Sequence, residues 1–152
     1  MDVSFEDLTR ATHDAVRTLI LEGLGEHWGY IDESLNPDLD DMFTAYADGR
    51  TIVARSQDGS VIGTGTLKPV DGSTAQMVRM SVDGRARRLQ VGRQVVDELV
   101  ATARAWGCDR VIVETTTEWT GVVEFYLRCG FEITHVEELE FGEGTWFQKE
   151  LT

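Results

Sequence analysis

One stretch of sequence decides the fold: Met80-Ser81-Val82-Asp83-Gly84-Arg85-Ala86-Arg87-Arg88-Leu89-Gln90-Val91-Gly92-Arg93. Its pattern predicts a strand that ends near Val82, then a basic turn containing glycine, then an amphipathic helix. The first turn of a helix leaves backbone N–H groups without internal partners, and the helix dipole adds about half a positive charge there. The stretch therefore predicts an anion site in which main-chain amides bind a phosphate. The alternative is an ordinary turn whose arginines lie in solvent, since short motifs often arise by chance.

Length and composition predict one globular domain over residues 1–152. The chain has 152 residues, of which 41% are hydrophobic, and neither repeats nor linker segments divide it. Its two cysteines, Cys108 and Cys129, fit neither a metal site nor a CxxC motif, so we expect no metal and no catalytic thiol. The first residues are acidic and no apolar run reaches transmembrane length, so we expect a cytoplasmic protein.

The charge balance restricts the partners. There are 27 acidic and 14 basic side chains, which gives a formal net charge of −13. This charge repels nucleic acid and anionic membranes except at a local basic patch, so we expect neither as a partner. It favours a cationic substrate, while a charged surface that only maintains solubility is the alternative.

The first half of the chain predicts two helices followed by strands. A strand over 3–8 precedes a helix that Thr12 caps, with a loop over 23–35 behind it. Asn36-Pro37 is typical of the start of a second helix. Strands over 51–54 and 61–67 flank the turn Gln57-Asp58-Gly59-Ser60, and a further strand covers 74–82.

The second half predicts alternating helices and strands. The helix after the basic turn has one apolar side and ends at Gly107; that side consists of Val91, Val95, Leu99, Ala103 and Trp106. The β-branched run 110–115 predicts a strand buried on both faces and parallel to the one ending at Val82. A helix over 122–128 and a hairpin of strands 131–136 and 144–151 complete one mixed sheet with helices on both faces.

Two motifs together point to a known family. Arg87-Arg88-Leu89-Gln90-Val91-Gly92 fits a Q/R-x-x-G-x-G/A turn, with Gln90 in place of the usual middle glycine. Phe125-Tyr126-Leu127-Arg128-Cys129-Gly130-Phe131 fits a helix ending in F/L-Y-x-x-x-G-F. With these motifs about 35 residues apart, the chain resembles the GCN5-related N-acetyltransferases, the GNAT family, which transfer an acyl group from acetyl-CoA to an amine. The asparagine often found seven residues before that tyrosine is Trp119 here.

The resemblance implies a fold and a coenzyme site. The implied fold is α/β (α+β), with a single mixed and mostly antiparallel sheet of about six to seven strands, about four flanking helices and splayed central strands. Main-chain groups of Met80 and Val82 would face the pantetheine arm of acetyl-CoA, and amides from Arg88 to Arg93 would bind its pyrophosphate. The implied coenzyme-binding residues are Met80, Val82, Arg87, Arg88, Leu89, Gln90, Val91, Gly92 and Arg93. The side chains of Arg87 and Arg88 pair with phosphate oxygens in this interpretation, or else lie on the surface.

The resemblance also implies catalytic roles. Acyl transfer to an amine needs a neutral nitrogen, a polarised carbonyl and a proton for the departing thiolate. Tyr126 is the implied acid, with aromatic packing as its alternative role. Glu114, near the end of a strand, is a candidate base or else a solvent-facing residue. Glu26, Trp28 and Tyr30 are candidate acceptor-binding residues, with anchoring of a loop as the alternative.

Three functional hypotheses follow. The first is an acetyl-CoA-dependent N-acetyltransferase that acts on a primary amine of a small molecule or an amino-acid or peptide acceptor, possible as a homodimer and without metal. The second is a noncatalytic acyl-CoA-binding or regulatory module with the same fold. The third, a nucleotide phosphate site, lacks the lysine expected after the glycine turn.

Overall fold

The structure, a computed structural model, describes residues 3–29, 33–140 and 142–151, with the side chains of Arg88 and Leu89 left aside. The elements follow the chain in this order: β1 (Val3–Asp7), α1 (His13–Trp28), η1 (Glu33–Leu35), η2 (Pro37–Leu39), α2 (Met42–Ala45), β2 (Arg50–Ser56), β3 (Val61–Pro69), β4 (Thr74–Val82), η3 (Gly84–Leu89), α3 (Val91–Ala105), β5 (Arg110–Thr116), α4 (Thr120–Arg128), β6 (Glu132–Leu139) and β7 (Gly142–Glu150). Here η marks a 3-10 helix.

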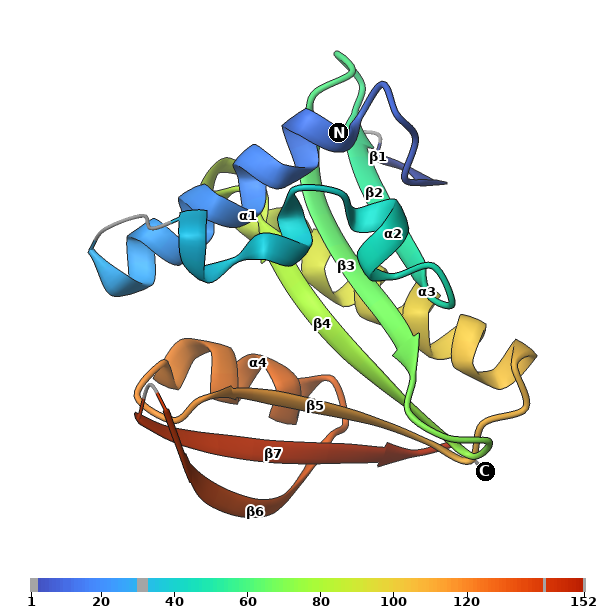
Figure 1. Ribbon diagram of the computed structural model, residues 1–152, viewed down its shortest axis with the longest axis vertical. Helices are drawn as coiled ribbons and strands as arrows, with labels where there is room; N and C mark the ends of the chain where they lie inside the picture. Colours follow the sequence, from blue (N-terminus) through green and yellow to red (C-terminus); the bar gives the residue numbers. More distant parts are fainter. Residues whose placement is uncertain (1–2, 30–32, 141, 152) are drawn as a thin grey trace.

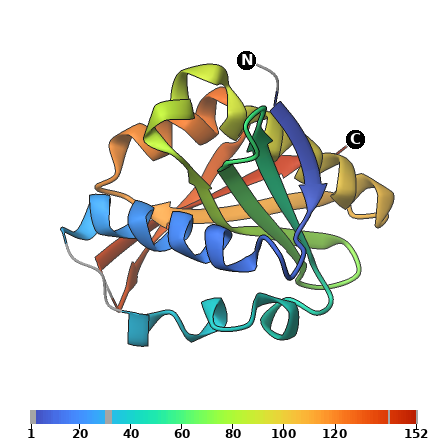
Figure 2. The ribbon, with the colours of Figure 1, turned by 90° about the horizontal axis from the view of Figure 1, so that it is seen from above.

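The described strands form one mixed sheet of seven in the order β1-β2-β3-β4-β5-β7-β6. The pair β4–β5 is parallel, as predicted, and the others are antiparallel, in line with the mostly antiparallel sheet that was expected. Helices α1 and α2 cover one face, and α3 and α4 cover the other (Figures 1 and 2). The predicted fold class is confirmed. None of the helices among the described residues is long and apolar enough to span a membrane.

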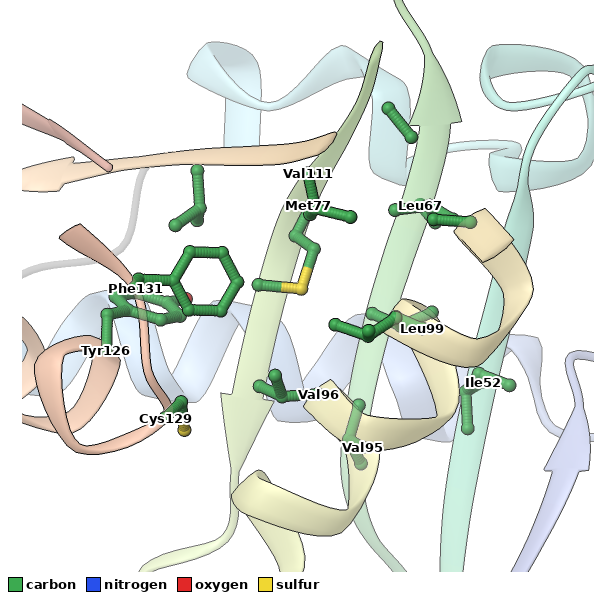
Figure 3. Close-up of a cluster of buried hydrophobic side chains, with 14 of the residues drawn as sticks. Ile52, Leu67, Met77, Val95, Val96, Leu99, Val111, Tyr126, Cys129 and Phe131 are labelled. Atoms are coloured by element: carbon green, nitrogen blue, oxygen red, sulfur yellow. The ribbon is translucent and has the colours of Figure 1, made fainter. Parts of the chain in front are cut away.

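Each face of the sheet has its own apolar cluster. On the α1 face, Val53 of β2 packs with Val16 and Ile20. On the α3 face, the larger cluster combines α3 with β2–β5, β7 and α4 (Figure 3). The apolar side of α3 packs into this cluster as predicted. Trp106 is the exception: it is 38% exposed because it lies beyond the end of the helix. Alternating burial along β5 shows that only one face of this strand is fully buried, which corrects the expectation of burial on both.

The segment between β1 and β2 departs most from the prediction. Helix α1 continues to Trp28 and ends at Gly29 in a left-handed conformation, so the predicted loop over 23–35 is wrong for its first half. Thr12 occupies the N-cap position but forms no side-chain cap, because its hydroxyl bonds to Thr9. The helix expected at Asn36-Pro37 is a three-residue 3-10 turn, and α2 begins instead at the Asp41 cap.

The sheet opens between β4 and β5. Their pairing covers Thr74–Met77 of β4 and Arg110–Val113 of β5, although each strand runs further, to Val82 and Thr116. Figure 1 shows the two strands together at one end and apart at the other. A β-bulge bends β4 where it leaves β5, since Arg79 and Met80 together lie opposite Gly65 of β3. The predicted splay of the central strands is present, and it leaves a gap between the ends of β4 and β5.

Candidate active site

The N-terminus of α3 lies beside this gap and can accept an anion. Because Gln94 is the first residue whose amide bonds back into the helix, to the carbonyl of Gln90 (3.1 Å), the amides of Val91, Gly92 and Arg93 have no intrahelical acceptor. No side chain caps this end within the described part of the chain. Of the amides expected to bind a pyrophosphate, from Arg88 to Arg93, these three therefore lie at the start of a 15-residue helix, where an anion is favoured.

Gln90 adopts the backbone conformation that a glycine would favour at this position. Its φ of 58° and ψ of 25° are left-handed, and it joins η3 to α3. Its side chain is exposed to solvent. Gly92 keeps its own steric role, because a Cβ added there would lie 3.2 Å from the Phe125 ring and 3.3 Å from Val82. The turn is thus closely packed against α4 and β4.

Arginine side chains around this turn already have protein partners. Arg87 donates to Glu26 at 2.5 Å, and Arg93 donates to the carbonyl of Arg128 at 3.1 Å. Arg85 forms an ion pair with Asp83 at 3.0 Å. These groups are exposed, except that Asp83 is largely covered, so a bound phosphate would compete with Glu26 for Arg87. The side chains of Arg88 and Leu89 lie outside the described set.

Met80 and Val82 lie in the part of β4 that runs beyond its pairing with β5. Both side chains are partly buried against the cluster on the α3 face. Beyond Met77, β4 has no strand partner on the β5 side among the described residues. Main-chain groups in this part of β4 therefore border the gap, which is the property that the sequence interpretation requires of Met80 and Val82.

The last turn of α1 contacts the loops on both sides of the gap. Glu26 reaches Arg87 in the segment after β4, as described above. His27 stacks on Trp119 with ring centroids 4.2 Å apart, and Trp28 meets the same indole edge-on at 5.2 Å. Trp119 precedes α4, in the segment after β5. Burial and the positive charge of Arg87 lower the pKa of His27. Tyr30 lies outside the described residues.

A small cavity lies between α1 and the end of β4. Three carboxylates line it, from Glu22, Glu26 and Asp83, together with the apolar Leu19 and Val82. Its lining is suited to a cationic group, although Glu26 and Asp83 each pair with an arginine. Within the described residues, no group of three or more His, Cys, Asp or Glu side chains is placed to hold a metal ion.

Tyr126 is buried between α4 and the sheet. It is 4% exposed, and its ring contacts Phe125, Phe131 and Phe147 with centroids 5.2–5.9 Å apart. Burial raises the pKa of its phenol, and nearby Cys129 and Glu114 raise it further. The hydroxyl therefore keeps its proton at neutral pH. Burial likewise raises the pKa of the Cys129 thiol, so this cysteine is not a thiolate nucleophile.

Glu114 lies on the opposite face of β5 from the Tyr126 cluster. Val113 packs in that cluster, and side chains alternate along a strand, so Glu114 points to the α1 face. It is half-buried beside Trp146, and Gly144 makes room for its carboxylate, which a Cβ at Gly144 would meet. Burial and the neighbouring Glu137 raise its pKa. The two candidate catalytic groups thus lie on opposite faces of the sheet.

Comparison with known proteins places this geometry in a family. The model of the Acetyltransferase (GNAT) family matches residues 15–131. The chain belongs to the GNAT family. It is 32% identical over 120 residues to "IAA acetyltransferase" of Azospirillum brasilense, which is 78% of this chain and 77% of that protein. As a GNAT protein with a named acetyltransferase relative, it is an N-acetyltransferase enzyme, and the predicted family and enzyme class are confirmed.

Solved GNAT structures share the whole fold. An acetyltransferase of the GNAT family from Staphylococcus aureus Mu50 matches 99% of this chain and 100% of its own, with a TM-score of 0.89 and 20% identity. A GNAT acetyltransferase from Elizabethkingia anophelis, solved with acetyl-CoA bound, matches 98% of each chain with a TM-score of 0.76 and 18% identity. These likenesses concern the arrangement of helices and strands.

Some contacts around the gap were not predicted from the sequence. The contact of His27 and Trp28 with Trp119 was not foreseen, although Trp119 stood out at a position where the family often has asparagine. An ion pair between Arg79 and Asp38 was also missed. Its two residues are 41 positions apart in the sequence, and no motif links them.

Proposed function

We propose that this protein transfers an acetyl group from acetyl-CoA to a primary amine of a small molecule or an amino-acid or peptide acceptor, by direct attack, with Tyr126 as general acid. The observation that carries the proposal is the gap between β4 and β5, bordered by the N-terminus of α3, which no described side chain caps. The residues fit the coenzyme, because the free amides of 91–93 suit a diphosphate and unpaired β4 backbone suits the amides of a pantetheine arm. Acetyl-CoA supplies the reactive thioester when bound.

The chain's own groups supply binding and proton transfer. Amides of Val91, Gly92 and Arg93 bind the diphosphate, while main-chain groups of Met80 and Val82 orient the arm and its carbonyl. Tyr126 donates the proton that the departing thiolate takes up. Its raised pKa keeps the phenol protonated at the pH values where an amine is neutral enough to attack.

Glu114 is proposed as the base that accepts the amine proton, directly or through water. Its raised pKa brings the carboxylate closer to the amine's proton affinity than an exposed glutamate would be. Its position on the α1 face is the side where the cavity lined by Glu22, Glu26 and Asp83 could hold a cationic amine. Glu26 and Trp28 lie on this same side, in the last turn of α1.

The test is an assay of free thiol release with acetyl-CoA and a panel of primary amines. We expect the wild-type protein to release CoA with at least one amine. Tyr126→Phe removes the proton donor without changing the ring packing, so turnover should fall about 10²- to 10⁴-fold while acetyl-CoA affinity, measured by calorimetry, stays the same.

Two results would count against this proposal. Release of no thiol with any amine would indicate a coenzyme-binding module without transfer activity. An unchanged turnover for Tyr126→Phe would remove Tyr126 as the acid and leave its aromatic packing as its role.

A further inference from the structure

Arg79 occupies an unusual backbone position inside β4. Its φ of 55° is left-handed, a conformation that costs free energy for a residue with a Cβ. It lies in the bulge, where Thr64 and Thr66 of β3 pair with Ser81 and Val78 of β4. Bulges redirect side chains and often border active sites. A local cost of this kind persists only when surrounding contacts hold the backbone in place.

The side chain of Arg79 has such contacts. Its Nε and a terminal nitrogen donate to the two carboxylate oxygens of Asp38 in η2, at 2.8 and 2.6 Å. The hydroxyl of Tyr46 donates to the same carboxylate at 2.5 Å. Arg79 and Asp38 retain only 21% and 22% of their side-chain exposure. A bidentate pair shielded from water is strong and geometrically specific.

The protonation states of Arg79, Asp38 and Tyr46 are fixed by their mutual contacts. Burial alone would raise the pKa of Asp38, but hydrogen bonds from Arg79 and Tyr46 outweigh it and lower that pKa. Burial, with the Asp38 carboxylate, raises the pKa of Tyr46 to about 12. The arginine and the carboxylate therefore stay ionised, and the tyrosine stays a hydrogen-bond donor, throughout the working pH range.

The bulge decides which way the end of β4 faces. With the extra residue, Arg79 reaches η2 on the α1 face, while Met80 packs with the cluster on the α3 face. In a regular strand, Arg79 would point to the face opposite Val78, into the α3-side core. The bulge also begins two residues after Met77, the last β4 residue paired with β5. The ion pair between Arg79 and Asp38, called the tether below, thus acts near the point where β4 turns away from β5.

We propose that Arg79 is a positioning residue, whose ion pair with Asp38 holds the bulge and thereby sets the main-chain groups of Met80–Val82 along the gap for the acyl-pantetheine arm. This inference rests on the proposed function, since it assigns those groups to acetyl-CoA. It makes the segment of η2 and α2, which carries Asp38 and Tyr46, a support of the coenzyme site. The diphosphate end of the coenzyme meets α3 instead and does not depend on this tether.

Two ligands separate the two ends of the coenzyme. Acetyl-CoA contains the pantetheine arm, whereas 3′-phosphoadenosine 5′-diphosphate contains only the nucleotide half. For Arg79→Met and Asp38→Asn we expect acetyl-CoA binding, measured by calorimetry, to weaken about tenfold, because the arm loses its aligned partners. Binding of the nucleotide half should stay within about twofold of wild type. Arg79→Lys keeps the positive charge but cannot form the bidentate contact with Asp38, so it should restore only part of the lost acetyl-CoA affinity.

The matched control is Arg17→Gln. Arg17 pairs with Glu33 (3.1 Å) and Asp40 (3.7 Å), so these ion pairs anchor the same segment to α1 rather than to β4. It should leave both affinities unchanged. If Arg79→Met fails to fold, the isosteric Asp38→Asn carries the test. Wild-type acetyl-CoA affinity in the Arg79 and Asp38 variants would overturn the inference, as would equal weakening of both ligands. A wild-type protein that binds neither ligand would overturn the proposed function and the inference with it.

Discussion

Glu114 shows how the environment of one residue joins stability to chemistry. It is half-buried on β5, and burial together with Glu137 raises its pKa above the ordinary value of 4.5. A carboxylate in this position costs folding free energy whenever it is ionised. The penalty is absent below the unfolded-state pKa and grows as the pH rises through the raised folded-state pKa. A group retained at such a cost is a reasonable candidate for a base.

This linkage predicts a pH-dependent gain for Glu114→Gln. The variant should melt about 1–2 °C higher than wild type at pH 7, and the difference should shrink to nothing near pH 4. Glu138→Gln is the control, because Glu138 is exposed on β6 and its substitution removes the same charge. Thermal melts followed by circular dichroism across this pH range would measure both. A gain that is largest at low pH would contradict the linkage.

At the scale of elements, α1 joins the two sides of the site. Its last turn reaches Arg87 through Glu26 and Trp119 through His27 and Trp28, so it spans the loops that follow β4 and β5. Arg87 therefore has two candidate partners, Glu26 and a coenzyme phosphate. An exposed ion pair contributes about 0.2–1 kcal/mol, which is the scale on which the two compete.

This competition predicts that Glu26→Gln tightens acetyl-CoA binding. The dissociation constant of acetyl-CoA should be about two- to fivefold lower for the variant than for wild type at low salt. The difference should be smaller at high salt, because the Glu26–Arg87 ion pair is exposed and salt screens it. Glu22→Gln removes an equal charge from the same cavity without breaking the Arg87 pair, so it should have a smaller effect. Calorimetric titrations at two salt concentrations would measure this. Weaker binding by Glu26→Gln, or an equal effect of Glu22→Gln, would refute it.

Sequence patterns were sufficient for the strands from Thr51 onward, but they failed for the second half of α1. Strand and hairpin positions from Thr51 onward were predictable because turn chemistry and apolar periodicity agree there, as at Asp58-Gly59. Gly23 instead suggested the start of a loop. In the structure it lies inside α1, where a Cβ would approach the Ser81 hydroxyl oxygen to 2.8 Å. Close packing of a helix on a strand depends on a tertiary contact, which local patterns do not record.

For the candidate site, the sequence predicted the positions of some elements but not of others. The position of the α3 N-terminus and of Tyr126 came from two motifs. The left-handed conformations of Arg79 and Gln90 could not be read from residues that rarely adopt them. The Arg79–Asp38 pair depends on how the η2 segment folds back onto β4, and this is fixed by the whole sheet rather than by any stretch of sequence.

At the scale of the molecule, two half-sheets share one core. Strands β1–β4 and strands β5, β7 and β6 meet through only four residue pairs between β4 and β5. The cluster on the α3 face nonetheless contains Leu99 from one side and Phe131 from the other, with Met77 between them (Figure 3). Packing, rather than strand pairing, therefore holds the halves together while the opposite end of the gap remains open.

Met77→Ala tests whether packing, rather than strand pairing, holds the two half-sheets together. Met77 is 1% exposed at the last paired position of β4, so the truncation leaves a cavity between the halves and should cost about 2–5 kcal/mol of unfolding free energy. Because one cluster spans both halves, we expect a single transition in denaturant, with coincident fluorescence and circular dichroism curves. Ile133→Ala, on the exposed strand β6, should cost less than about 0.5 kcal/mol. Two separated transitions in either variant would show that the half-sheets unfold independently. If Met77→Ala lowers the unfolding free energy no more than Ile133→Ala does, packing around Met77 does not hold the two half-sheets together.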